Sequence, residues 1–191
     1  MNKPKFKITY NSPVILTFML VSFAVLVLSW ITGGKSDLLL FSVYRSSLLD
    51  PLFYIRLFTH ILGHSGLEHF VGNFMIILLI GPMLEEKYGK SRMIIMILLT
   101  AFVTGLINVV FFPGSALLGA SGIAFMLILL SGFASSKSGE LPLTLIFVAA
   151  LYIGQEIMAG IFAADNISQL THIIGGVCGF GFGLATNNKK F

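Results

Sequence analysis

The chain has 191 residues, of which 56% are hydrophobic and 10% are charged, and its mean hydropathy is +0.94. Soluble domains carry about 25% charged residues, so this composition excludes an ordinary soluble protein and indicates an all-α integral membrane protein. The single cysteine, Cys178, excludes an intrachain disulfide and a cysteine-based metal motif.

Six apolar segments are long enough to cross a bilayer, which takes about 17 to 25 residues. In chain order we expect spans at residues 14–32, 69–84, 93–112, 119–135, 141–163 and 169–186. Turn or charge signals such as "GGKSD" and "EEKYGKSR" separate them. Lysines precede the first segment, as in a signal peptide, but no small-residue cleavage pattern follows it. We therefore expect a retained first span and a single membrane domain over residues 1–191.

Lysine and arginine are distributed unevenly between the two ends of these spans. With the N-terminus in the cytoplasm, nine of the 12 lie on the cytoplasmic side and three on the outer side. Because positive residues concentrate in cytoplasmic loops, both termini are predicted to be cytoplasmic. The net charge of +4 follows from this topology and requires no nucleic-acid partner.

Residues 33–68, between the first two spans, are too apolar for a flexible linker. They include "LLLFSVYRSSLLDPLFYIRLFTHILGHSG", which is rich in aromatic and aliphatic residues. We expect this segment to form short helices that lie partly in the membrane interface.

Polar side chains fall near the starts of the second, fourth and sixth spans. His69 and Asn73 are four residues apart and share one face of the second span. Ser121 begins the fourth span, and His172 lies near the start of the sixth. The predicted topology puts all three starts in the outer leaflet, so the four side chains share one depth. A serine, a base and two hydrogen-bond donors are the parts of an acyl-transfer site.

Each of these residues has a simpler explanation when it is taken alone. A serine in a membrane helix usually bonds a carbonyl of the preceding turn, and a histidine or asparagine often joins neighbouring helices. Polar groups inside a membrane are costly, and it is their shared depth that favours the catalytic interpretation.

Two glycines flank the candidate nucleophile. Gly119 and Gly122 let a substrate or another backbone approach Ser121 closely. The start of the fourth span also directs unpaired amides to a developing oxyanion. This span is about 25 Å long for about 17 residues, so "FFPGSALL" is expected to enter the membrane as a loop. Phe125, four residues after Ser121, is predicted to lie under the base.

The third and sixth spans carry faces suited to supporting this site. Thr100, Thr104 and Asn108 are spaced four apart, and they either hold water on a path to the site or make packing hydrogen bonds. Gly175 follows His172 by three residues and begins a row of glycines that permits close helix packing.

Three motifs, in this order, resemble those of the rhomboid intramembrane serine proteases. "HILGHSGLEHFVGN" is similar to the family's histidine-rich start of the second span, "GASG" to its nucleophile motif and "HIIG" to its base motif. The resemblance extends from about Arg56 to Gly183 and matches the compact six-span form. A compact chain without a transit peptide suggests a prokaryotic plasma membrane.

The resemblance implies a role for each matching residue. Ser121 would be the nucleophile and His172 its general base, in a dyad without a third acid. His69 and Asn73 would donate hydrogen bonds to the oxyanion. The supporting set comprises Gly119, Gly122, Phe125, His60, His64, Arg56, Glu85, Gly175, Thr100, Thr104 and Asn108.

The implied activity is that of a serine endopeptidase that cleaves single-span membrane proteins near the outer leaflet. A helix hides its carbonyls, so Gly or Pro near the cleaved bond makes the necessary unwinding less costly. The alternative is a catalytically silent rhomboid-like binder of membrane clients, although such relatives typically lose the serine or the histidine. Glu156 either bonds a neighbouring span or faces a water-filled site, and the oligomeric state stays open.

A metal site is a further rival, since His60, His64, His69 and His172 could gather. The chain has no HExxH motif, and Glu68 precedes His69 in the wrong order for such a site. We therefore expect neither a metal nor another cofactor.

Overall fold

The computed structural model describes residues 9–134, 136, 140–162 and 167–187. Within these residues the chain forms seven α-helices, and its one pair of bridged residues, Val43 and Leu117, is antiparallel. The helices are α1 (Pro13–Thr32), α2 (Pro51–Thr59), α3 (Leu67–Tyr88), α4 (Lys90–Phe111), α5 (Ser121–Ser131), α6 (Leu143–Phe162) and α7 (Ile167–Asn187).

The helices include membrane-spanning candidates. In the described part of the chain, α1, α3 and α4 are long and apolar enough to cross a bilayer. Shorter apolar helices lie at Pro51–Leu62, Ser121–Ser131 and Leu143–Tyr152. The predicted class, an all-α membrane protein, is therefore confirmed. A helix lies on each of the six expected segments, while the number of crossings stays a prediction.

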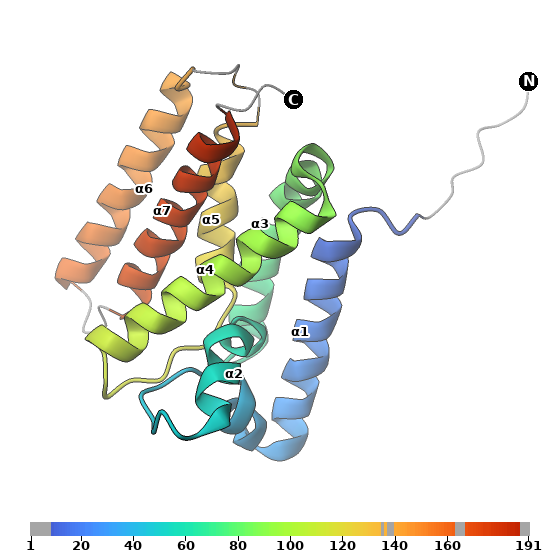
Figure 1. Ribbon diagram of the computed structural model, residues 1–191, viewed down its shortest axis with the longest axis vertical. Helices are drawn as coiled ribbons and strands as arrows, with labels where there is room; N and C mark the ends of the chain where they lie inside the picture. The colour runs from blue at the N-terminus through green and yellow to red at the C-terminus, as the bar shows by residue number, and fades with distance from the viewer. Residues whose placement is uncertain (1–8, 135, 137–139, 163–166, 188–191) are drawn as a thin grey trace, which may run out of the picture.

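Helices α1, α3, α5, α7 and α6 lie in a row that α4 crosses, and α2 packs against α4 (Figure 1). α1 contacts α3, α3 contacts α5, α5 contacts α7, and α7 contacts α6. Fully buried side chains of α1, α3, α4 and α5 form the main core, among them Ile15, Ile77, Met93 and Leu127. This core fixes α3, which carries His69 and Asn73, against α5, which begins with Ser121.

Glycines of α7 bring it unusually close to α5. A Cβ atom added at Gly175 would lie 2.2 Å from the carbonyl oxygen of Gly122, and one at Gly179 would lie 2.0 Å from that of Met126. Side chains at these positions would clash with the α5 backbone. The predicted glycine face of the sixth span is thus packed against the helix that begins with Ser121.

α5 is shorter than the predicted span 119–135. It begins at Ser121, after Gly119 with φ +128°, and ends at Ser131. At its end, the Lys87 ammonium donates to the carbonyl oxygens of Phe133 and Ala134, each at 2.6 Å. These 11 residues measure about 16 Å, so hydropathy overestimated the helix by including the turn that follows it.

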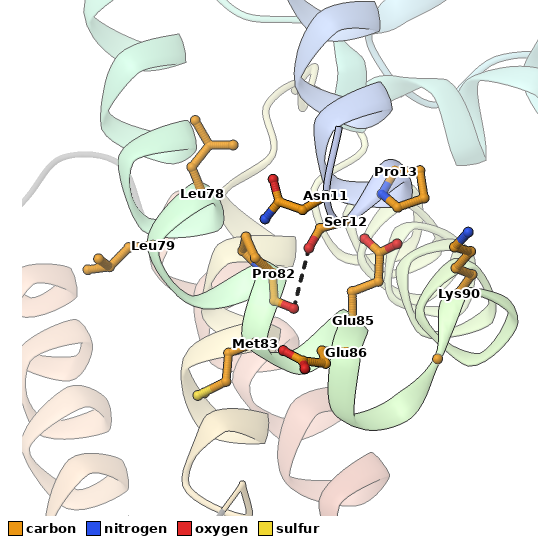
Figure 2. A pocket seen from close by; sticks show the side chains of 11 residues that line it. Asn11, Ser12, Pro13, Leu78, Leu79, Pro82, Met83, Glu85, Glu86 and Lys90 are labelled. Atoms are coloured by element: carbon orange, nitrogen blue, oxygen red, sulfur yellow. Dashed lines mark hydrogen bonds between the residues drawn. The ribbon is translucent and has the colours of Figure 1, made fainter. Parts of the chain in front are cut away.

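Glu85 joins the start of α1 to the far end of α3. Its buried carboxylate accepts hydrogen bonds from the Val14 amide at 3.1 Å and the Ile15 amide at 3.0 Å. Both amides belong to the first turn of α1, where backbone N–H groups have no partner within the helix. Figure 2 shows Glu85 beside this turn, at a cavity of about 700 Å³ across which Ser12 donates to the Pro82 carbonyl.

The segment between α1 and α3 is folded, as expected. It contains the π-helix η1 (Asp37–Phe41), α2 and the short 3₁₀ helix η2 (His60–Leu62). Asp50 accepts from the Leu52 amide to begin α2, and its other oxygen pairs with Arg56 at 2.5 Å. The Arg56 guanidinium is buried and also lies 4.5 Å over the Tyr44 ring. Arg56 therefore holds this segment together.

Candidate functional site

The loop before Ser121 is fastened to the segment between α1 and α3. Val43 and Leu117 exchange two backbone hydrogen bonds, each of 2.9 Å. The Asn108 side chain donates to the carbonyl oxygens of Val43 at 3.2 Å and Ser115 at 3.3 Å. Residues 112–120 thus reach α5 as a held loop rather than as helix, and Asn108 of α4 supports it.

His64 supports the same loop one residue before Ser121. Its Nδ1 lies 3.1 Å from the Leu62 carbonyl oxygen, which can only accept, so Nδ1 carries the proton. Its Nε2 then accepts the Ala120 amide at 3.4 Å. Burial, and secondarily the charge of His69, lower the pKa of His64 to about 4. The neutral ring required by this bond is therefore the form present at neutral pH.

His60 is a second buried histidine under the loop. Its backbone carbonyl accepts the Gly119 amide at 2.9 Å, and its Nδ1 donates to the Arg56 carbonyl at 3.2 Å. Burial lowers its pKa to about 4. The Thr104 hydroxyl lies 3.4 Å from Nε2 of His60 and donates to the Thr100 carbonyl at 2.8 Å. Thr104 thus joins α4 to His60, and Asn108, one turn further along α4, joins it to the loop.

The backbone of Gly119 lies against the two predicted oxyanion donors. A Cβ atom added there would lie 2.7 Å from Cε1 and 2.8 Å from Nε2 of His69, and 3.7 Å from Nδ2 of Asn73. Asn73 is 8% exposed, and its Nδ2 has no hydrogen-bond partner among the described residues. Two side-chain nitrogens from one face of α3 therefore converge just before Ser121.

His172 lies on the face of α5 that carries Ser121. Its ring centroid is 4.3 Å from that of Phe125, one turn after Ser121, and Phe125 in turn stacks on Tyr152 of α6 at 4.3 Å. Beside Ser121, a Cβ atom at Gly122 would lie 3.3 Å from Thr104 and 3.6 Å from Thr171. His172 and His69 are also close enough for their charges to interact.

The predicted site residues therefore separate into two groups. His69, Asn73, Gly119 and Phe125 lie around Ser121 and His172, with the His60 and His64 supports and the α4 stripe behind them. Glu85 is 16 residues after His69 on α3, about 24 Å away along the helix, and acts on α1 instead. The Glu156 side chain lies outside the described residues.

Sequence reasoning missed two residues that contact this group. Ser65 lies 3.1 Å, Oγ to Nδ1, from His69, and Tyr152 closes the stack over Phe125. Helical spacing does not relate Ser65 to His69, because Ser65 precedes α3 and the extended Gly66 lies between them. Nothing in the sequence indicated that Tyr152 faces α5.

Fold and residues together define a helical membrane protein with a serine at the start of a short helix and histidines close to it. A family model described as the Rhomboid domain matches residues 52–189. The chain belongs to the rhomboid family.

Named relatives agree with this assignment. The chain is 28% identical over 181 residues to "Rhomboid protease GluP" of Bacillus subtilis, covering 93% of the chain and 34% of that protein. It is 32% identical over 141 residues to "Rhomboid-related protein 1" of Caenorhabditis elegans, covering 67% and 38%, and 29% identical over 133 residues to "RHOMBOID-like protein 1" of Arabidopsis thaliana, covering 65% and 32%. The chain thus spans about a third of the length of these relatives.

Proposed function

We propose that the chain is an intramembrane serine endopeptidase in which Ser121 is the nucleophile and His172 the general base. Family membership and a relative named as a protease support this class of activity. The geometry around Gly119 supports the assignment of residues.

The observation that carries the proposal is the buried Asn73 amide, whose Nδ2 has no hydrogen-bond partner in the described part of the chain. A buried donor without a partner costs about 1 to 3 kcal/mol, a cost that an acceptor bound beside it would remove. Nδ2 of Asn73 and Nε2 of His69 both face the backbone of Gly119, two residues before Ser121. An oxygen that becomes negative beside Ser121 would satisfy both donors, which is the requirement of an oxyanion hole.

The dyad would work as follows. Ser121 Oγ attacks the carbonyl carbon of the scissile bond while its proton passes to the neutral imidazole of His172, and the carbonyl oxygen becomes negative. When the tetrahedral intermediate collapses, the C–N bond breaks and His172 returns the proton to the leaving amine. Water then gives a proton to His172 and attacks the acyl carbon, the ester C–O bond breaks, and His172 returns the proton to Ser121 Oγ. Phe125, at 4.3 Å from the His172 ring, restricts how that ring can turn.

The remaining predicted residues would hold this machinery in place. His60 and His64 fix the backbone before Ser121, and Gly175 lets α7 bring His172 close to α5. The stripe of Thr100, Thr104 and Asn108 borders the same loop, where it would also be placed to hold the hydrolytic water.

The substrates would be single-span membrane proteins cleaved near the outer leaflet, with a cleavage region that unwinds easily. The protein would lie in a prokaryotic plasma membrane as one domain over residues 1–191, crossing it six times with both termini cytoplasmic. This orientation follows from the distribution of Lys and Arg.

Reconstitution with a single-span substrate tests the proposal. Ser121→Ala and His172→Ala should each abolish cleavage, and Ser121→Ala should also abolish labelling by a fluorophosphonate. Ser131→Ala, at the other end of α5, is the matched control and should cleave normally, because the Ser131 hydroxyl bonds the Ile128 carbonyl. Cleavage that survives Ser121→Ala contradicts the dyad. A wild type that binds a client without cleaving it indicates a silent rhomboid-like binder.

A further inference from the structure

We infer that Ser65 is a positioning residue that fixes the tautomer of His69, so that His69 presents its Nε2 proton to the oxyanion. The inference rests on the proposed function. Its structural basis is the 3.1 Å separation between Ser65 Oγ and Nδ1 of His69. Ser65 lies before α3 and His69 in its first turns, with the extended Gly66 between them at φ 172°.

The Ser65–His69 hydrogen bond has two possible directions in a neutral imidazole. If the ring donates from Nδ1 to the Ser65 oxygen, Nε2 carries a lone pair and would repel an oxyanion. If the Ser65 hydroxyl donates to Nδ1, the ring proton is on Nε2. Nε2 is the nitrogen that faces Gly119, 2.8 Å from the Cβ position there. Only the second direction makes His69 an oxyanion donor.

A doubly protonated His69 would also donate from Nε2, but the reaction opposes it. His172 becomes positive when it takes the proton of Ser121, and His172 and His69 are close enough for their charges to interact. Because two positively charged rings repel each other, a positive His69 would oppose the positive charge that forms on His172. A neutral ring directed by a hydroxyl avoids this repulsion while keeping the donor.

Ser65 lies at the surface of the protein. Together with Gly66, Glu68 and His69 it lines an open cavity of about 420 Å³ at the start of α3. Because the hydroxyl is exposed, water can replace part of its effect. A net hydrogen bond of this kind is typically worth about 0.5 to 1.5 kcal/mol, so its loss should change rates by about three- to tenfold.

Steady-state kinetics of the full chain in liposomes tests the inference. Ser65→Ala should lower kcat by about three- to tenfold with KM unchanged, and Ser65→Thr, which keeps the hydroxyl, should restore kcat. A peptide aldehyde, which forms an oxyanion on Ser121, should bind Ser65→Ala more weakly by the same factor. The matching peptide alcohol, which forms none, should bind both proteins equally. Ser47→Ala, an exposed serine of the same segment, is the control.

A double-mutant cycle separates action through His69 from a general structural effect. Ser65→Ala should cause no further loss in a His69→Ala background, because the group on which Ser65 acts is gone. The inference is overturned if Ser65→Ala keeps the wild-type kcat, or if it lowers kcat equally with and without His69. The proposed function fails by a different result, namely cleavage by Ser121→Ala.

Discussion

The imidazole of His69 lies directly against the backbone of Gly119, and no side chain fits between them. A Cβ atom at Gly119 would be 2.7 Å from the His69 ring. The backbone of Gly119 has a φ of +128°, which glycine adopts readily and other residues rarely do. We predict that Gly119→Ala displaces His69 or the loop and lowers the cleavage rate by about 100-fold, as expected for loss of an oxyanion donor. Cleavage by the reconstituted protein measures this.

Gly114 provides the matched control in the same loop. A Cβ atom there would meet no atom of the described residues within 4 Å. Gly114→Ala should therefore cleave at the wild-type rate. Equal losses in both variants would mean that the loop is sensitive to any substitution rather than to contact with His69.

Close packing of α7 on α5 gives a second prediction. Gly179→Ala places a methyl group 2.0 Å from the Met126 carbonyl oxygen, so the helices must separate. We expect a loss of about 1 to 3 kcal/mol in the free energy of unfolding. A Cβ atom at Gly181, on the same helix, would lie within 4 Å of no residue that the structure describes, so Gly181→Ala should stabilise the helix slightly. Thermal unfolding in detergent compares the two, and similar melting temperatures would contradict the close contact.

The third prediction concerns the two hydrogen bonds that the first turn of α1 donates to Glu85 of α3. Glu85→Gln removes one of two carboxylate acceptors, leaving either the Val14 or the Ile15 amide without its partner. The expected loss of stability is about 1 to 3 kcal/mol. Glu86→Gln changes the adjacent, exposed carboxylate and should leave the unfolding temperature almost unchanged. If both variants unfold alike, Glu85 does not cap α1.

The sequence was sufficient for features that depend on local composition. Apolar runs predicted α1, α3 and α4, and a spacing of four put His69 and Asn73 on one face of α3, where both lie beside the Gly119 backbone. The predicted fourth span ends at residue 135, four residues beyond the end of α5 at Ser131, because hydropathy does not register the turn at Gly132. Contacts between distant segments, such as the Val43–Leu117 bridge that holds the loop, depend on tertiary packing and have no local signal.

The candidate site shows the same division. Motif spacing selected the residues around Gly119, but it could not reveal which nitrogen of His64 accepts the Ala120 amide. That assignment needed the Leu62 carbonyl, which fixes the proton on Nδ1. Ser65 was overlooked because a serine outside a predicted span carries no cost that would draw attention to it.

The buried histidines make stability depend on pH, with a definite sign. Burial lowers the pKa of both His60 and His64 from 6.5 to about 4. Between these values the unfolded chain binds protons that the folded protein does not, so the free energy of unfolding decreases as pH falls from about 6.5 to 4. Above pH 6.5 the two histidines contribute no further change.

A variant at His64 isolates its share of this dependence. His64→Gln retains a hydrogen-bonding side chain beside Ala120 but cannot be protonated, so its unfolding temperature should fall less steeply between pH 6.5 and 4. Both proteins contain the same carboxylates, and the difference between their slopes therefore belongs to His64. Thermal unfolding in detergent at several pH values provides the measurement. Parallel slopes would mean that His64 does not titrate in this window, and the neutral ring would then need another explanation than burial.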